Sequence, residues 1–373
     1  HQGSGRVGGD GVMAKLGEVC LLKAGKFVSA NDISPEYNKG LYPCFGGNGI
    51  RGYVADYTHD GEFPLIGRQG ALCGNVNLAS GKFHATEHAV VVQPKIEMNV
   101  HWLYYAINAM NLGQYATGAA QPGLAVSKLE TLSIEIPNIS EQNKIAQTLY
   151  KVEQLVNFRK QQLAKLDELV KAQFVEMFGD INVNNKKWMT YPLGELCTIV
   201  RGGSPRPIER YLGGTIPWIK IGDATTGENI YLNSTKEYII QEGVKKSRMI
   251  KAGSLIFANC GVSLGFARII TFDGCIHDGW LAMEDIDEKL DKIFLLYSLN
   301  QMTEYFRKTA PAGTQPNLNT NIMKMHRQIV PPMEMQKAFI SFVKCADRQK
   351  QIVQQSLDKL ELMKKALMQE YFG

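Results

Sequence analysis

The sequence predicts an α+β protein in which two globular α/β domains are each followed by a long helix. The two helices are expected to pack as an antiparallel coiled coil, which gives the chain a pseudo-twofold internal repeat. Three observations carry this prediction: the second half of the chain repeats the first, the end of each half has heptad spacing, and the start of each half has short apolar runs broken by glycine. A chain of 373 residues is long enough for two domains with their own cores.

The repeat is the strongest of these features. Residues 121–179 align with residues 315–373 at a constant offset of 194, and the matched pairs include Pro137 with Pro331 and Gln142 with Gln336. Further upstream, Leu-Gly-Glu at 16–18 recurs at 193–195 with an offset of 177. The second half is therefore about 17 residues longer, and the extra length is expected in its N-terminal part.

The repeat and the composition together set the expected boundaries. The start of the chain is Gly-rich and has no pattern, so we expect it to be a cloning remnant ahead of a native start near Met13. The expected segments are 1–12 for this remnant, 13–138 for the first domain, 139–179 for the first long helix, 180–332 for the second domain and 333–373 for the second long helix.

The regular region of each half predicts a long helix. Positions spaced alternately by three and four residues are mostly apolar, which is typical of a coiled-coil seam. Proline and Glu/Gln residues precede each helix, and Phe-Gly ends it. About 35 residues at 1.5 Å each give roughly 50 Å. The expected spacer contacts are Leu149, Val152, Val156, Leu163, Leu166, Val170, Val343, Val353, Leu357, Leu360 and Leu367.

The remaining regions, 16–117 and 193–310, are predicted to be β-rich. Short apolar runs at 89–92, 254–257 and 268–270 indicate strands, and Gly, Asn and Asp between them indicate tight turns. Each region also contains one shorter helical pattern, near 101–112 and near 292–308.

Composition limits the function classes. No apolar run approaches the ~18 residues of a membrane span, no secretory signal is visible, and the seven cysteines contain no C-x-x-C pair. We therefore expect a cytoplasmic protein without a membrane partner, disulfide framework or metal site. The net charge of +5 is compatible with a nucleic-acid partner and is weak evidence alone.

The Gly-rich loops carry basic, amide and aromatic residues together, which favours contact with DNA. Glycine lets a backbone approach a partner closely, and Asn, Gln, Arg and Lys pair with base edges or phosphates. The candidate DNA-binding residues are Asn48, Arg51, Tyr53, Arg68, Gln69, His84, Thr86, His88, Gln121, Ser204, Arg206, Trp218, Lys220, Lys245, Lys246, Arg248, Asn259, His277, Trp280, Gln315 and Asn317.

No catalytic residue is predicted. His84, Glu87 and His88 spell the H-x-x-E-H signature of some metalloproteases, but that chemistry needs both histidines on one helix face, and a strand pattern follows here. The sequence has no phosphate-binding loop of the G-x-x-x-x-G-K type, no G-x-S-x-G elbow and no Asn-Pro-Pro-aromatic run of a DNA methyltransferase.

The chain resembles the specificity subunits of type I restriction–modification systems. Residues 42–53, 65–68 and 81–88 are similar to one style of target-recognition domain, and residues 216–223 with 252–256 are similar to another. Residues 137–145 resemble the entry to the family's helices, although Met335 stands in the second copy where Glu141 stands in the first. The resemblance covers nearly everything from Leu16 onward.

This resemblance implies a mechanism. Each domain is expected to recognise a few base pairs of double-stranded DNA, while the helix pair sets an unread spacer in a bipartite, asymmetric target. Two methyltransferase subunits are expected as partners, with nuclease–translocase subunits as further candidate partners. No cofactor is expected in this chain, because the partner would bind S-adenosylmethionine and methylate adenine. The source would be bacterial or archaeal.

Two other functions remain open from sequence. A two-module DNA-binding regulator would bind a split site without a methyltransferase. A protein scaffold would use the helices as its interaction surface, and the Gly-rich polar loops favour DNA over this alternative.

Overall fold

The computed structural model describes residues 11–70, 72–118, 122–225, 230–261, 263–310 and 317–373. Within them the chain divides into two compact units. The first ends at Gln161 and also takes in Gln354–Gly373, and the second is Gln162–Val353. Gln121 and Gln315, two of the predicted contact residues, lie outside the described residues.

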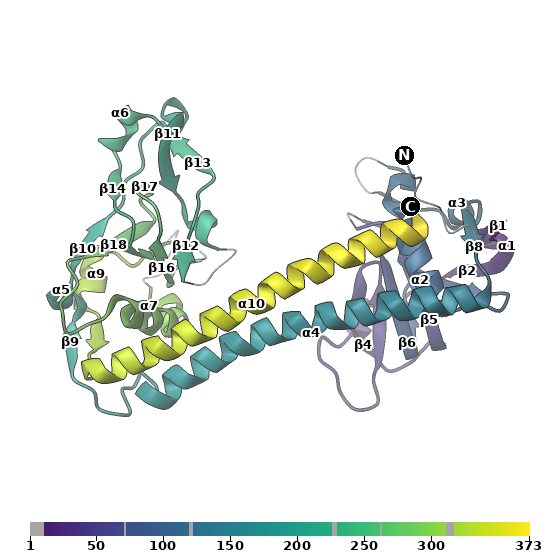
Figure 1. Ribbon diagram of the computed structural model, residues 1–373, viewed down its shortest axis with the longest axis horizontal. Helices are drawn as coiled ribbons and strands as arrows, with labels where there is room; N and C mark the ends of the chain where they lie inside the picture. Colours follow the sequence, from purple (N-terminus) through teal and green to yellow (C-terminus); the bar gives the residue numbers. More distant parts are fainter. Residues whose placement is uncertain (1–10, 71, 119–121, 226–229, 262, 311–316) are drawn as a thin grey trace, which may run out of the picture. The chain divides into compact units, whose positions relative to one another are not determined.

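The first unit contains a six-stranded mixed sheet in the order β2-β7-β5-β6-β3-β4 and a separate β1-β8 pair. The helix α2 packs on β5 and β6 (Figure 1). Its elements are β1 (Val12–Lys15), α1 (Leu16–Val19), β2 (Cys20–Ala24), η1 (Ala30–Asp32), β3 (Tyr42–Gly46), β4 (Gly49–Val54), β5 (His59–Gly67), β6 (Val76–Ala85), β7 (Ala89–Pro94), α2 (Val100–Ala109), η2 (Leu112–Tyr115), α3 (Val126–Glu130) and β8 (Ser133–Ile136).

The second unit contains sheets in the orders β10-β18-β15-β16-β12 and β13-β11-β17-β14, with a separate β19-β9 pair. Its elements are β9 (Thr190–Pro192), α5 (Leu193–Leu196), β10 (Thr198–Arg201), η3 (Ile208–Arg210), β11 (Leu212–Ile219), η4 (Ile221–Ala224), β12 (Tyr231–Leu232), β13 (Glu237–Ile239), α6 (Gln241–Val244), β14 (Arg248–Ile250), β15 (Leu255–Ala258), β16 (Ala267–Ile270), β17 (Gly274–Ile276), β18 (Trp280–Glu284), α7 (Lys292–Gln301), α8 (Thr303–Thr309), α9 (Thr320–Met325) and β19 (Arg327–Ile329).

The two long helices are α4 (Ile139–Phe178) and α10 (Met333–Phe372), each drawn in Figure 1 as one uninterrupted helix. They pack antiparallel. In the first unit Lys364 of α10 pairs with Glu153 of α4 at 2.7 Å, and in the second unit Lys350 of α10 pairs with Asp167 of α4 at 2.6 Å. Every predicted spacer residue is buried or half-buried, which confirms the coiled-coil prediction.

The strands of the two units pair in the same arrangement, which we call the shared frame. In the first, β3 lies parallel to β6 with Phe45 opposite Ala85, and in the second β11 lies parallel to β17 with Ile219 opposite Ile276. The antiparallel pair β5–β7 is matched by β15–β18, and β1–β8 is matched by β9–β19. This match confirms the predicted internal repeat at the level of strand pairing.

The register also locates the extra length of the second unit. The offset between matched residues is 174 at Phe45 and Ile219, and it is 191 at Gly67 and Ala258. The 17 additional residues therefore lie between Ile219 and Leu255, which is the segment that contains β12, β13, α6 and β14.

A glycine explains the repeated Leu-Gly-Glu motif. A Cβ at Gly17 would lie 2.8 Å from Glu130 Cβ on α3, and a Cβ at Gly194 would lie 2.9 Å from Lys324 Cβ on α9. The short helices α1 and α5 therefore need glycine where α3 and α9 cross them. None of these four short helices was predicted from sequence.

Candidate nucleic-acid interface

The Gly-rich segments of the first unit meet at one end of the sheet. A Cβ on Gly67 would lie 2.0 Å from Gly47 O, so the end of β5 touches the tip of the β3–β4 hairpin. The amide of Arg68 donates to His88 O at 3.0 Å, which joins the same loop to the turn between β6 and β7. Three segments that are distant in sequence therefore form one loop cluster.

Most of the predicted residues of the first unit lie on the accessible part of this cluster. Asn48, Arg51 and Gln69 are exposed, while Arg68 and His88 are half-buried. Asn48 accepts a hydrogen bond from Asn75 Nδ2 at 2.8 Å. Tyr53 is half-buried, and its ring makes an edge contact with Tyr37.

Two predicted residues of this cluster are buried instead. Thr86 has no exposed surface, and His84 is 8% exposed with Nε2 at 3.2 Å from Lys26 O. The contact of His84 with Lys26 helps to hold the turn, and neither side chain reaches the surface, so the expectation that they contact a partner directly is wrong for this conformation. His84 lies in β6 and His88 lies in a turn, so the H-x-x-E-H residues do not share a helix.

Several buried polar atoms of this cluster lack a hydrogen-bond partner within the described part of the chain. They are Arg68 Nε, Asn77 Nδ2, His84 Nδ1, Thr86 Oγ1 and Glu87 Oε2. The charges of Arg51 and Glu87 also act in opposite directions on the pKa of Cys44, which burial raises. Unpartnered polar atoms are uncommon inside proteins, so their concentration makes this cluster the candidate site of the first unit.

The matching turn of the second unit is centred on Asp278. Its Oδ1 accepts from Ser204 Oγ at 2.6 Å and lies 3.0 Å from His277 Nε2, while Oδ2 lies 3.7 Å from the Arg206 guanidinium. Arg201 Nε donates to the Asp278 carbonyl at 3.0 Å. Burial raises the pKa of Asp278, but the Ser204 hydrogen bond and the nearby cations outweigh burial and lower it overall. Asp278 therefore stays ionised among cations.

A basic surface surrounds this turn. Arg248 Nε donates to Arg201 O at 2.9 Å, and Lys246 Nζ donates to Tyr211 Oη at 2.6 Å. Lys245 is exposed, and Lys220 forms an ion pair with Glu237. Five of the predicted residues, Ser204, Arg206, Lys246, Arg248 and His277, are thus linked to the same turn or to the loops beside it.

Three predicted residues of the second unit are buried in or under this surface. Trp280 and Asn259 have no exposed surface, and Trp218 is 4% exposed with its ring against His277. Trp280 belongs to the apolar core, so the expectation of direct contact through these side chains is wrong for this conformation. Asn259 instead donates through Nδ2 to Asn317 Oδ1 at 3.1 Å and so positions Asn317.

The sequence-based list of contact residues does not include Glu87, Asp278, Arg201 and Asn77, which the structure places in the two loop clusters. A signal for the turn existed in Gly25 and Gly202, which follow the repeat offset of 177. A Cβ on Gly25 would lie 2.0 Å from Ala85 O, and one on Gly202 would lie 2.2 Å from His277 O. Both glycines therefore mark the strand that runs directly behind the turn.

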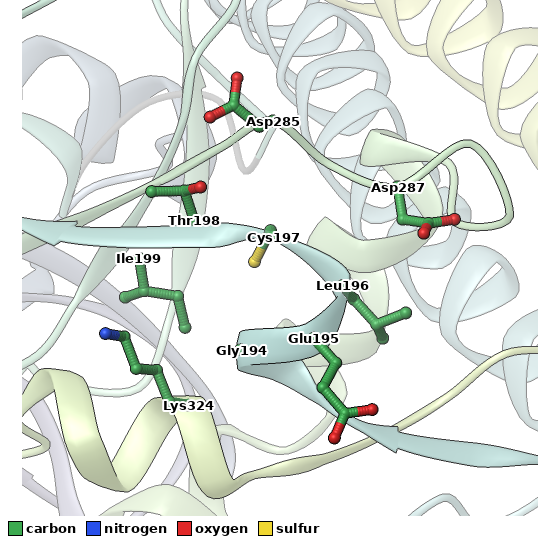
Figure 2. Close-up of a pocket in the computed structure, with 9 residues that line it drawn as sticks. All are labelled: Gly194, Glu195, Leu196, Cys197, Thr198, Ile199, Asp285, Asp287 and Lys324. Atoms are coloured by element: carbon green, nitrogen blue, oxygen red, sulfur yellow. The ribbon is translucent and has the colours of Figure 1, made fainter.

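A separate shallow cavity of about 360 Å³ lies in the second unit, beside the Leu-Gly-Glu motif (Figure 2). Lys324 of α9 faces it together with Glu195, Asp285 and Asp287. Its residues are not part of the loop cluster around Asp278. Among the residues that the structure describes, no group of His, Cys, Asp and Glu is arranged to hold a metal ion. No helix in the same ranges is long and apolar enough to cross a membrane.

Comparisons with known proteins agree with this architecture. The family model for the type I restriction modification DNA specificity domain matches residues 10–168 and 185–362. The chain is 51% identical over 149 residues to the EcoprrI specificity subunit of Escherichia coli, an alignment that spans 40% of this chain and 37% of that subunit. It is 24% identical over 315 residues to the MjaIX specificity subunit of Methanocaldococcus jannaschii, which spans 76% of this chain and 72% of that subunit.

A solved structure shows the same fold. The type I restriction–modification S subunit from M. genitalium matches with a TM-score of 0.62 at 17% identity, covering 98% of this chain and 97% of that chain.

Proposed function

The chain belongs to the type I restriction–modification DNA specificity family, and from that premise we propose that it directs partner enzymes to a two-part DNA target without catalysing a reaction itself. The observation that carries this proposal is the shared frame of the two units. Each unit presents one loop cluster of basic, amide and acidic side chains at matched backbone positions. The two clusters differ in their side chains, so the two half-sites are expected to differ in sequence.

The partner surface is proposed on the long helices. Phe158 and Met363 are exposed apolar residues of the first unit, and Leu169 and Ile352 are exposed apolar residues of the second. The repeat offset of 194 relates Phe158 to Ile352 and Leu169 to Met363. Each unit therefore contains one residue from each of these two matched pairs. Two equivalent pairs of exposed apolar residues support two copies of one partner.

The partners are proposed to be two methyltransferase subunits, with nuclease–translocase subunits as further members of the complex. These subunits would bind S-adenosylmethionine and methylate adenine, while this chain supplies the DNA contacts in the cytoplasm. The antiparallel helix pair is proposed to fix the unread spacer between the half-sites.

Selection from randomised duplex DNA tests the proposal. The chain would be bound to the methyltransferase subunit encoded beside it, at near-physiological salt, because phosphate contacts dominate affinity at low salt. Two short motifs with a fixed gap are expected. A chain carrying Phe158→Asp and Met363→Asp should lose one of two bound methyltransferase copies in native mass spectrometry, whereas the exposed control Gln161→Ala should keep both.

One compact motif, or no enrichment, would contradict the specificity-subunit function. Selection of the same split motif by the chain alone, together with failure to bind any methyltransferase, would favour a two-module DNA-binding regulator.

A further inference from the structure

The turns that contain Glu87 and Asp278 are held by the same backbone hydrogen bonds. The amide of Gly25 donates to Ala89 O at 3.0 Å, and the amide of Gly202 donates to Trp280 O at 2.9 Å. Within each turn, the amide of Ala89 donates to Thr86 O and the amide of Trp280 donates to His277 O, both at 3.0 Å. Glu87 and Asp278 therefore occupy the same position of the same turn.

The loop that faces each turn is matched as well. Arg68 N donates to His88 O and Asn259 N donates to Gly279 O, each at 3.0 Å. The carbonyls of Arg68 and Asn259 then accept from the amides of Leu124 and Leu318, at 2.9 and 2.7 Å. The two acidic residues thus lie in equivalent surroundings, although the side chains around them differ.

In each unit the protein engages one carboxylate oxygen and leaves the other without a hydrogen bond. Glu87 Oε1 lies 3.2 Å from His88 Nε2, and Oε2 is buried with no partner in the described ranges. Asp278 Oδ1 holds Ser204 and His277, and Oδ2 faces the Arg206 guanidinium at 3.7 Å, which is beyond hydrogen-bond length. Both side chains are about a third exposed, so a rotation of either carboxylate presents an oxygen that can accept one further hydrogen bond from a donor on a ligand.

A carboxylate in the middle of a basic surface does not suit phosphate, because the two anions repel each other. It suits a base edge that presents a donor in the major groove. Cytosine presents its N4 amino group there without an adjacent acceptor, whereas adenine presents N7 beside its N6 amino group. Thymine and guanine present acceptors, which a carboxylate repels. Cytosine is the base that this geometry favours.

We propose that Glu87 and Asp278 are specificity-determining residues, each of which accepts a hydrogen bond from the N4 amino group of a cytosine, one in each half of the DNA target. The inference rests on the proposed function. It adds that both half-sites contain a G·C pair, with the cytosine on either strand, and that the same backbone position recognises it in both units.

The test is DNA selection with the full complex, using the unchanged chain, Asp278→Asn, Glu87→Gln and the control Asp273→Asn. Asp273 is an exposed carboxylate of the second unit, paired with Lys251 at 2.7 Å outside the loop cluster, so its change removes the same charge elsewhere. The unchanged chain should select a G·C pair in each half. Asp278→Asn should reduce the preference for that pair about tenfold or more in one half, and Glu87→Gln should do the same in the other half.

The outcomes separate this inference from the proposed function. If the unchanged chain selects no split motif, the proposed function fails. If it selects a split motif that lacks a fixed G·C pair in either half, or if both variants keep the original preference in both halves, the inference fails and the proposed function stands. An equal loss of the G·C preference in Asp273→Asn would also overturn the inference, since the loss would then come from the change in net charge. Glu87→Gln and Asp278→Asn lie in different units, so misfolding of one variant leaves the other as a test.

Discussion

The two units use one backbone frame to present different side chains. The position after the shared strand β5 or β15 is Arg68 in the first unit and Asn259 in the second, and the next position is Gln69 or Cys260. The hydrogen bonds that hold these positions run between backbone atoms, so they do not depend on which side chain is present. The candidate DNA-contact residues can therefore differ between the units while the backbone of the loops keeps the same position.

The units also differ at the C-terminal ends of the long helices. Phe178 and Phe372 end α4 and α10 at the repeat offset of 194. Phe178 is fully buried in an aromatic cluster with Phe174, Phe294 and Phe339. Phe372 is half-buried and packs on the edge of the first unit's core. Residues that are equivalent in sequence therefore contribute unequally to stability.

The largest expected effect is a difference in stability between variants at these two equivalent positions. Phe178→Ala should lower the free energy of unfolding of the second unit by about 3–5 kcal/mol, because it opens a cavity in a closed aromatic cluster. Phe372→Ala should cost the first unit clearly less, since that ring is already partly exposed to water. Hydrogen exchange measured on peptides from each unit distinguishes the two. Equal losses in the two variants would contradict the difference in burial.

The next effect is a loss of stability that should be similar in the two units, because it concerns a pair of matched buried glutamines. Gln142 and Gln336 are almost fully buried at matched positions. Gln142 Oε1 accepts from the amide of Asn99, and Gln336 Oε1 accepts from the amide of Asp291, both at 2.9 Å; these two residues cap α2 and α7. Gln142→Ala and Gln336→Ala should each cost about 1–3 kcal/mol, because each leaves buried backbone groups unpaired.

Chemical denaturation followed by hydrogen exchange would measure both losses, with the exposed Gln161→Ala as a control expected within about 0.5 kcal/mol. A large loss for one glutamine and none for the other would show that the two helix entries are not equivalent.

The sequence predicted the repeated layout because periodic apolar positions leave a direct record of which helix face is buried. The seam from Leu149 to Val170 and the matched Gln142 and Gln336 are examples. The loop cluster was harder to predict, because it depends on which backbone segments meet. Trp280 and Trp218 have the composition of contact residues, yet strand pairing places both inside. Glu87 and Asp278 have no sequence pattern of their own, and their equivalence follows from hydrogen bonds between distant segments.

The smallest expected effect concerns the ion pairs that cross the helix seam. Glu153 with Lys364 in the first unit and Asp167 with Lys350 in the second are half-buried pairs, although the repeat offset does not relate one pair to the other. Double-mutant cycles to alanine should give coupling energies of about 0.2–1 kcal/mol for each pair, because partial burial reduces screening only modestly. Glu153 also accepts a hydrogen bond from Tyr105 Oη at 2.8 Å, so Glu153→Ala alone should cost more than Asp167→Ala.

Salt sharpens this last comparison. The pair of Lys160 with Glu361 crosses the same seam at 2.9 Å, but both side chains are about half exposed or more, at 56% and 49%. Its coupling should be the weakest of the three and should vanish first as salt is raised, since mobile ions screen exposed charges most effectively. A coupling for Lys160 and Glu361 that exceeds the other two, or that does not change with salt, would mean that burial does not rank these pairs and that helix register depends on the apolar seam alone.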